Sequence, residues 1–125
     1  GLFLPAGIGK DKCLLIAEGE SDTAALLSAG MDAIGRPSCL GLISMVKGYL
    51  NRLDVIPEIV ICADDDLPGL NGARKLATGL LEMTTSVRII RPPSCKDFRE
   101  WIYGGATRQS IECLIHAAKF WRGDR

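Results

Sequence analysis

Acidic residues gather at three places in the 125-residue chain, and each place follows a short run of apolar residues. Glu18 and Asp64–Asp66 come directly after the runs 14–17 and 59–63, and Asp97 lies a few residues beyond a third run. Such runs are typical of buried parallel strands, and open α/β sheets bind ligands beyond the carboxyl ends of their strands. Because carboxylates gathered there would repel one another, we expect a divalent cation, Mg²⁺ or Mn²⁺, at this edge of the sheet.

The spacing within each acidic stretch indicates which side chains act together. Alternate residues of an extended backbone point the same way, so Asp64 and Asp66 are expected to share one metal ion while Asp65 points elsewhere. Gly69 would then turn the chain into the next helix. Three carboxylates after an apolar strand are costly without a cation, although a solvated acidic loop is the simpler alternative.

The first acidic stretch, residues 18–22, has an equally simple structural alternative. Gly19 would allow a sharp turn and the close approach of a ligand, with Glu18 in the crevice and Asp22 in the first helical turn. However, Ser21 could simply cap that helix, Asp22 could favour its positive end, and Glu18 could be solvated.

The third stretch, residues 96–102, also has two interpretations. Asp97 and Glu100 have the spacing of a capping box, which would begin a helix without any function. Phe98 and Trp101 are more typical of a core than of a base-stacking surface. On residue chemistry alone, the functional and structural interpretations are even.

Strand and helix patterns alternate along the chain. We predict strands at 13–17, 32–34, 58–63 and 86–91, with 1–5 as a candidate short edge strand, and helices at 21–30, 42–53, 71–81, 97–103 and 107–120. This order predicts an α/β fold, Rossmann-like, with a central, mostly parallel sheet of about four strands flanked by helices on both faces. The length is that of one domain, 1–125.

Composition excludes few functions. Fifteen basic and fifteen acidic residues cancel, so the net charge argues neither for nor against nucleic acid. Basic residues recur near the expected site and again near the end of the chain, namely Lys47, Arg52, Arg74, Lys75, Arg91, Lys96, Arg99, Lys119, Arg122 and Arg125. A basic rim around the acidic centre is one interpretation, and scattered solvated charges are the other.

The cysteines and the ends of the chain bear on location. Five cysteines are widely spread with no CxxC pair, which favours reduced, mostly buried thiols in a cytoplasmic protein over a zinc site. No apolar segment is long enough to span a bilayer, so we expect no membrane partner. Because the chain begins at Gly1, we expect a domain excised from a longer protein.

Together, the three acidic stretches resemble the Toprim domain, the catalytic module of bacterial DnaG-type primases, topoisomerases, small nucleases and recombination proteins. That family has a strand ending in a Glu-Gly pair, similar to Glu18-Gly19 with Asp22 behind it. It has a second strand ending in D-x-D-x-x-G, similar to Asp64–Gly69. Phage and plasmid members add a Lys-Asp pair before a helix, similar to Lys96-Asp97. The resemblance covers about residues 14–102 and is greatest to primase-type domains of mobile-element proteins.

The resemblance implies metal-dependent nucleotidyl transfer in the synthesis of RNA primers on single-stranded DNA. It implies that Glu18, Asp64 and Asp66 are catalytic and hold one or two Mg²⁺ ions, which would clamp nucleotide phosphates and activate the attacking 3′-hydroxyl. Glu18 could instead act as a general acid or base. The further metal ligands would be Asp22 and Asp97. The phosphate-binding or nucleic-acid-binding residues would be Lys96, Arg74, Lys75 and Arg99.

The resemblance also implies partners, which the chain would bind as part of its parent protein. They are a single-stranded DNA template, nucleoside triphosphates and a helicase domain or subunit. In this chain Leu67-Pro68 precedes Gly69 and Arg74 comes late, which departs from the family pattern and leaves the role of Arg74 open. The nearest alternative is a Toprim nuclease that hydrolyses phosphodiesters. Alternatives of another class are a phosphoacceptor receiver domain, which would need an acidic pair where Glu18-Gly19 stands, and a non-catalytic nucleic-acid-binding module.

Overall fold

A computed structural model describes residues 2, 4, 13–36 and 43–123 of the chain. The strands are β1 (Cys13–Glu18), β2 (Ala33–Arg36), β3 (Glu58–Cys62) and β4 (Val87–Ile90). The helices are α1 (Gly19–Ser28), α2 (Ile43–Asn51), α3 (Leu67–Leu80), α4 (Phe98–Tyr103) and α5 (Arg108–Ala117). The predicted edge strand at 1–5 falls largely outside the described residues, as does Cys39. No helix of the described part is long and apolar enough to cross a membrane.

The four strands form one parallel sheet in the order β2-β1-β3-β4, which confirms the predicted fold class. In the register of β1 and β3, Ile16 lies opposite Ile61, so both strands end at the same edge. On the other side of β1, Glu18 lies opposite Arg36. The order of the strands in the sheet therefore brings the carboxyl ends of β1, β2 and β3 together.

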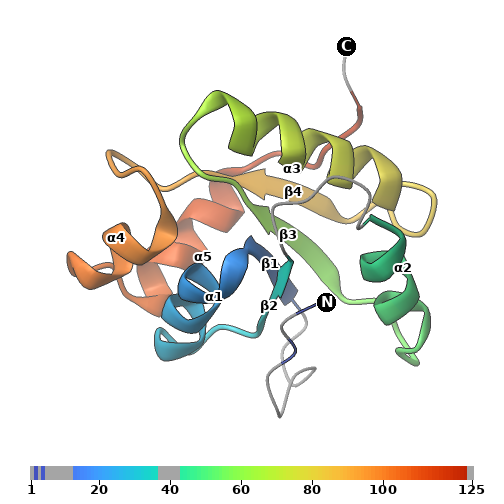
Figure 1. Ribbon diagram of the computed structural model, residues 1–125, viewed down its shortest axis with the longest axis horizontal. Helices are drawn as coiled ribbons and strands as arrows, with labels where there is room; N and C mark the ends of the chain where they lie inside the picture. The colour runs from blue at the N-terminus through green and yellow to red at the C-terminus, as the bar shows by residue number, and fades with distance from the viewer. Residues whose placement is uncertain (1, 3, 5–12, 37–42, 124–125) are drawn as a thin grey trace.

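The sheet is the middle of three layers (Figure 1). Helices α2 and α3 cover one face, and α1, α4 and α5 cover the other. The strands alternate accordingly, since Leu14 and Ile16 of β1 pack in one core while Leu15 and Ala17 pack in the other. Strands that are buried on both faces consist of continuous apolar runs, and this is why they could be predicted from the sequence.

Several element boundaries differ from those predicted. Helix α3 begins at Leu67, four residues before the predicted start, because Asp66 caps it and Pro68 stands in its first turn, where its missing N–H costs nothing. Strand β2 runs on to Arg36 instead of ending at residue 34. The prediction of Ser21 as a helix cap was wrong, because α1 already begins at Gly19.

The end of α5 also differs, and it changes the outer edge of the sheet. The helix ends at Ala117, and the following residues run along β4 instead. The Trp121 N–H donates to the Val87 carbonyl oxygen at 2.7 Å, and Phe120 forms an antiparallel bridge with Arg88. The chain thereby covers the edge strand β4, which would otherwise present unpaired backbone groups to solvent.

The expectation of mostly buried cysteines was wrong for the described residues. Cys62 is buried within β3, Cys13 and Cys95 are half-buried, and Cys113 is exposed on the outer side of α5. None of these four described cysteines takes part in a disulfide bond.

Candidate metal centre

The carboxylates of Glu18, Asp64 and Asp66 line one cleft of about 380 Å³ at the carboxyl edge of the sheet. This convergence is what parallel neighbouring strands predict. Arg36 and Lys75 line the same cleft and place two positive charges beside the three negative ones.

Glu18 reaches the cleft because β1 passes directly into α1. Gly19 has a φ of 79°, a left-handed conformation that a residue with a side chain rarely adopts, and it turns the chain sharply as expected. Glu18 stands at the N-cap position of α1, but its side chain makes no capping hydrogen bond. The helix therefore begins without a side-chain cap, and the Glu18 carboxylate is turned to the cleft.

The loop from β3 to α3 presents Asp64 and Asp66 on one side. Asp66 caps α3, since its Oδ1 accepts a hydrogen bond of 2.7 Å from the Gly69 N–H. Asp65 points away from the cleft, as expected, and its Oδ1 lies 3.4 Å from Nη1 of Arg91. Gly69 lies in the first turn of α3, where a Cβ would stand 3.0 Å from the Asp64 carbonyl oxygen and 2.8 Å from Asp66 Oδ1. Glycine is needed at position 69 because a side chain would not fit there, and not because the backbone has an unusual φ.

Two further acids tie α4 to this centre. Asp97 caps α4 through a hydrogen bond of 2.8 Å from the Glu100 N–H to its Oδ1. Glu100 reaches back one residue further than a capping box requires, because its Oε2 accepts from the Lys96 N–H at 3.2 Å. Asp22 is only 7% exposed, and its Oδ1 accepts from the Arg99 N–H at 3.3 Å. Asp22 thus joins α1 to the first turn of α4.

Electrostatic interactions also connect these acids. The pKa of Asp64 is raised to about 6, first by burial and then by the negative charges of Asp22, Glu18, Asp66 and Asp97. Asp22 also has a raised pKa, caused by burial and then by the charge of Asp97, although backbone hydrogen bonds at the start of α4 act in the opposite direction. At neutral pH the centre therefore holds more negative charge than its surroundings offset.

Arg36 is a residue of this site that the sequence analysis missed. It is 8% exposed at the end of β2, and burial lowers its pKa while the charge of Glu18 opposes that shift. Its Nη2 would lie 3.3 Å from a Cβ at position 72, so Gly72 leaves room for the guanidinium. If the predicted strand had extended to residue 36, Arg36 would have been recognised as a site residue, because it then lies opposite Glu18 in the parallel register.

The basic residues predicted to bind phosphate divide into two groups. Lys75 lines the acidic cleft, whereas Arg74 is on another side of α3 and lines a separate groove. Lys96 and Arg99 are exposed at the start of α4, and neither is among the described residues that line the cleft. The backbone of Lys96 has a structural role, since its carbonyl oxygen accepts from the Asp65 N–H at 2.7 Å.

The donor set suits a hard divalent cation. All the acids that converge here offer carboxylate oxygens, the ligands that Mg²⁺ prefers, and the pKa of Asp64 is raised by burial and then by the charges of its acidic neighbours. Among the described residues, no three acidic, His or Cys side chains already stand close enough together to enclose an ion. The cleft therefore fits an ion held by few side chains and completed by other oxygen ligands.

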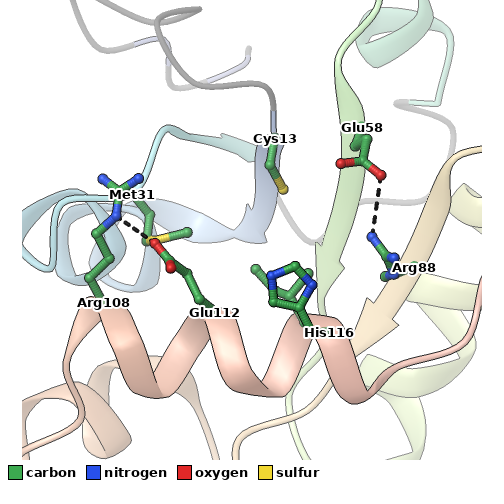
Figure 2. A pocket seen from close by; sticks show the side chains of 8 residues that line it. Cys13, Met31, Glu58, Arg88, Arg108, Glu112 and His116 are labelled. Atoms are coloured by element: carbon green, nitrogen blue, oxygen red, sulfur yellow. Dashed lines mark hydrogen bonds and ion pairs between the residues drawn. The ribbon is translucent and has the colours of Figure 1, made fainter.

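A second pocket, at the opposite edge of the sheet, shows by contrast what distinguishes the acidic cleft (Figure 2). There Glu58 lies 3.5 Å from Arg88 Nη1, and Glu112 lies 2.7 Å from Arg108 Nε. His116 lines the same pocket from α5. Because each carboxylate is matched to an arginine, this pocket carries no comparable excess of negative charge.

Comparison with solved structures supports the same fold. A chain of the bacteriophage T7 lagging-strand DNA polymerase complex with the primase domains of two gp4 subunits, bound to an RNA/DNA hybrid and dTTP, matches with a TM-score of 0.70 at 19% identity. The DnaG primase catalytic domain bound to single-stranded DNA matches with a TM-score of 0.70 at 19% identity, and a DNA primase domain from Pseudomonas aeruginosa with 0.69 at 22%.

These matches cover 87%, 88% and 85% of the present chain but only 56%, 36% and 33% of the solved chains. At such identities the likeness establishes the fold alone. A comparison with the curated proteins found no match. The family model described as Toprim-like matches residues 15–102, which include Glu18, Asp64, Asp66 and Asp97. The chain belongs to the Toprim-like family.

Proposed function

We propose that this chain is the catalytic domain of a primase-like protein that transfers nucleotides to a growing RNA primer on single-stranded DNA. The observation that carries the proposal is the convergence of Glu18, Asp64 and Asp66 in one cleft, with Asp22 and Asp97 close enough to act on the pKa of Asp64. Family membership and the fold shared with primase catalytic domains support it.

In this proposal Glu18, Asp64 and Asp66 hold Mg²⁺, or Mn²⁺ in its place. The bound ion would polarise the phosphates and favour the ionised 3′-hydroxyl. Asp22 holds the first turn of α4 against α1, Asp97 caps α4, and both add negative charge near the three ligands. Asp64, with a pKa near 6, is largely ionised at neutral pH and ready to bind a cation.

Arg36 and Lys75 have a complementary role in the same cleft. Their positive charges face the space beside the carboxylates, where phosphate oxygens of a bound nucleotide would lie. A buried guanidinium is fixed in place, and it donates to phosphate in a bidentate manner. Arg36 therefore orients the nucleotide, and Lys75, which is exposed, adds a mobile charge.

The test compares three neighbouring acids in the longest protein that contains this chain. Asp64→Asn and Asp66→Asn should abolish metal-dependent synthesis from ribonucleotides on single-stranded template, because each removes a ligand charge. Asp65→Asn is the matched control, since Asp65 points to Arg91 and should keep most of the activity. Equal loss in all three variants would contradict the proposed site. Hydrolysis of plain DNA without any primer synthesis would assign the same site to a nuclease.

A further inference from the structure

The C-terminal segment 118–123 builds a second surface of opposite charge. It runs beside β4 and α3 (Figure 1). Together these segments line a groove of about 430 Å³. We call this the basic groove, and its functional lining is Arg74, Arg91, Lys119, Arg122, Phe120 and Trp121. Among the described residues that line it, none is acidic.

Hydrogen bonds fix the segment on the sheet edge. Trp121 donates its backbone N–H to Val87, and its ring Nε1–H donates to Oγ1 of Thr78 at 3.2 Å. Arg122 Nη1 donates to the Thr85 carbonyl oxygen at 2.8 Å. The basic groove is therefore a preformed feature of the fold rather than a chance approach of a loose end.

The positive charges of the groove are available for a ligand. Arg74 and Lys119 are exposed and form no ion pair with another residue of the described part. Arg91 has only a 3.4 Å contact with Asp65, and both side chains are about half exposed, so solvent and salt weaken that pair. Four cations line the groove, and among the described residues only Arg91 has an acidic partner, so together they form a site for a polyanion.

Aromatic side chains in the groove favour nucleic acid over an acidic polypeptide. Phe120 is 38% exposed, and the guanidinium carbons of Arg88 and Arg122 lie 4.1 Å and 5.3 Å from its ring centre. A positively charged groove with partly exposed rings is the usual surface for single strands, because cations follow the phosphates while rings contact bases.

The groove also lies close to the acidic cleft. Leu70 and Arg74 of α3 face the groove, whereas Asn71 and Lys75, one residue later in each case, face the cleft. The two sites are thus separated by one helix, which is about 10–12 Å across, or roughly three nucleotides of a stacked strand at about 3.4 Å each.

From these observations we infer that the basic groove binds single-stranded nucleic acid through its phosphates and delivers it toward the acidic cleft. The inference extends the proposed function by naming where the strand is held. It predicts binding that does not require a metal ion, does not depend on sequence, and weakens steeply with salt.

The test measures fluorescence anisotropy of a labelled oligothymidylate with the 125-residue chain in EDTA, across a range of salt concentrations. Lys119→Glu should weaken binding several-fold, and Arg74→Glu/Lys119→Glu should weaken it further. Each lost contact should flatten the slope of log K against log salt concentration by about 0.7. Arg52→Glu is the matched control, because Arg52 is an exposed cation outside the groove and its reversal should leave affinity near wild type.

Three results would overturn the inference. They are equal weakening by Lys119→Glu and Arg52→Glu, no binding by the wild type at low salt, and displacement of the oligonucleotide by poly-glutamate as readily as by unlabelled strand. Circular dichroism of each variant checks that the fold is kept. The binding assay contains neither metal nor nucleotide, so a negative result would contradict the strand-binding role of the groove alone. The proposed catalytic function is tested separately, by the synthesis assay with Asp64→Asn.

Discussion

Asp64 is the residue whose chemistry depends most on its surroundings. Its pKa in the folded protein is about 6, above the ordinary 3.8, so the folded state holds this proton more tightly than the unfolded state does. The resulting contribution to stability is full below the ordinary pKa and is lost as pH rises through about 6. A bound cation would reverse this effect, because it requires the ionised form.

We therefore expect the metal-free wild type to lose unfolding free energy between pH 3.8 and about 6, and Asp64→Asn to lose less over that interval. Above pH 6 the variant should be as stable as the wild type or slightly more stable, because one of several crowded charges is gone. Urea denaturation in EDTA at a series of pH values measures both. A variant that melts well below wild type at neutral pH would show that Asp64 has a structural partner instead.

Asp66 combines two roles that substitution can separate. It lines the acidic cleft, and it also caps α3 through Gly69. Asparagine keeps an oxygen that accepts the capping hydrogen bond, whereas alanine does not. Because both substitutions remove the same charge, the difference between their unfolding free energies measures the contribution of the helix cap.

Asp66→Ala should be less stable than Asp66→Asn by about 1 kcal/mol, the usual value of a helix N-cap. Both variants should lose metal-dependent activity to the same extent. Thermal or chemical denaturation of the pair in EDTA gives the comparison. Equal stabilities would mean that the 2.7 Å hydrogen bond contributes nothing in solution.

At the scale of elements, the junction of β3 and α3 is built around the missing side chain of Gly69. An alanine Cβ would meet the Asp64 backbone at 3.0 Å, so the acidic loop or the helix would have to move. By contrast, Gly48 lies within α2 with no atom within 4 Å of the position of its Cβ. These two helical glycines provide a matched pair.

Gly69→Ala should cost about 1–3 kcal/mol of unfolding free energy, as overpacking generally does. It should also lower activity beyond that effect, because Asp64 and Asp66 flank the new methyl group. Gly48→Ala should instead stabilise the protein by up to about 1 kcal/mol, since alanine favours the helix. Denaturation curves of the two variants test this, and a stabilised Gly69→Ala protein would contradict the packing described here.

Element boundaries explain what sequence analysis predicted and what it missed. The strands were predicted because double-sided burial makes them continuous apolar runs, as in β3. Arg36 was missed because Gly35 and Pro37 indicated a turn, whereas pairing with β1 extends β2 to Arg36. The end of α5 was overpredicted because residues 118–120 are helix-compatible locally, and only hydrogen bonding of the following chain to β4 draws them into an extended course.

At the scale of the whole molecule, the sheet order determines which acids meet. Parallel pairing of β1 with β3 was predictable from the alternation of elements, and it brings Glu18 and Asp64 to one edge. The basic groove was not predictable, because its cations come from α3, from the residue that follows β4 and from the C-terminal segment, and net charge conceals them. The zero net charge thus divides into an acidic cleft and a basic groove on neighbouring sides of α3.

The last prediction concerns the chain by itself, which should bind Mg²⁺ weakly and synthesise little or no primer. Mg²⁺ keeps several waters and is usually held by one or two carboxylates together with substrate phosphates. The described carboxylates do not already enclose an ion, so a nucleotide has to complete the set of ligands. Calorimetric titration with Mg²⁺ should therefore show much tighter binding when a nucleoside triphosphate is present, and Asp64→Asn should remove that gain.

Synthesis further requires a template fixed against the cleft, and orientation of this kind can contribute roughly 7–11 kcal/mol. The solved primase chains that share this fold are longer, since the matched part is 33% to 56% of each. Strong Mg²⁺ binding without nucleotide, or robust template-dependent synthesis by these 125 residues, would show that the cleft and the basic groove suffice on their own.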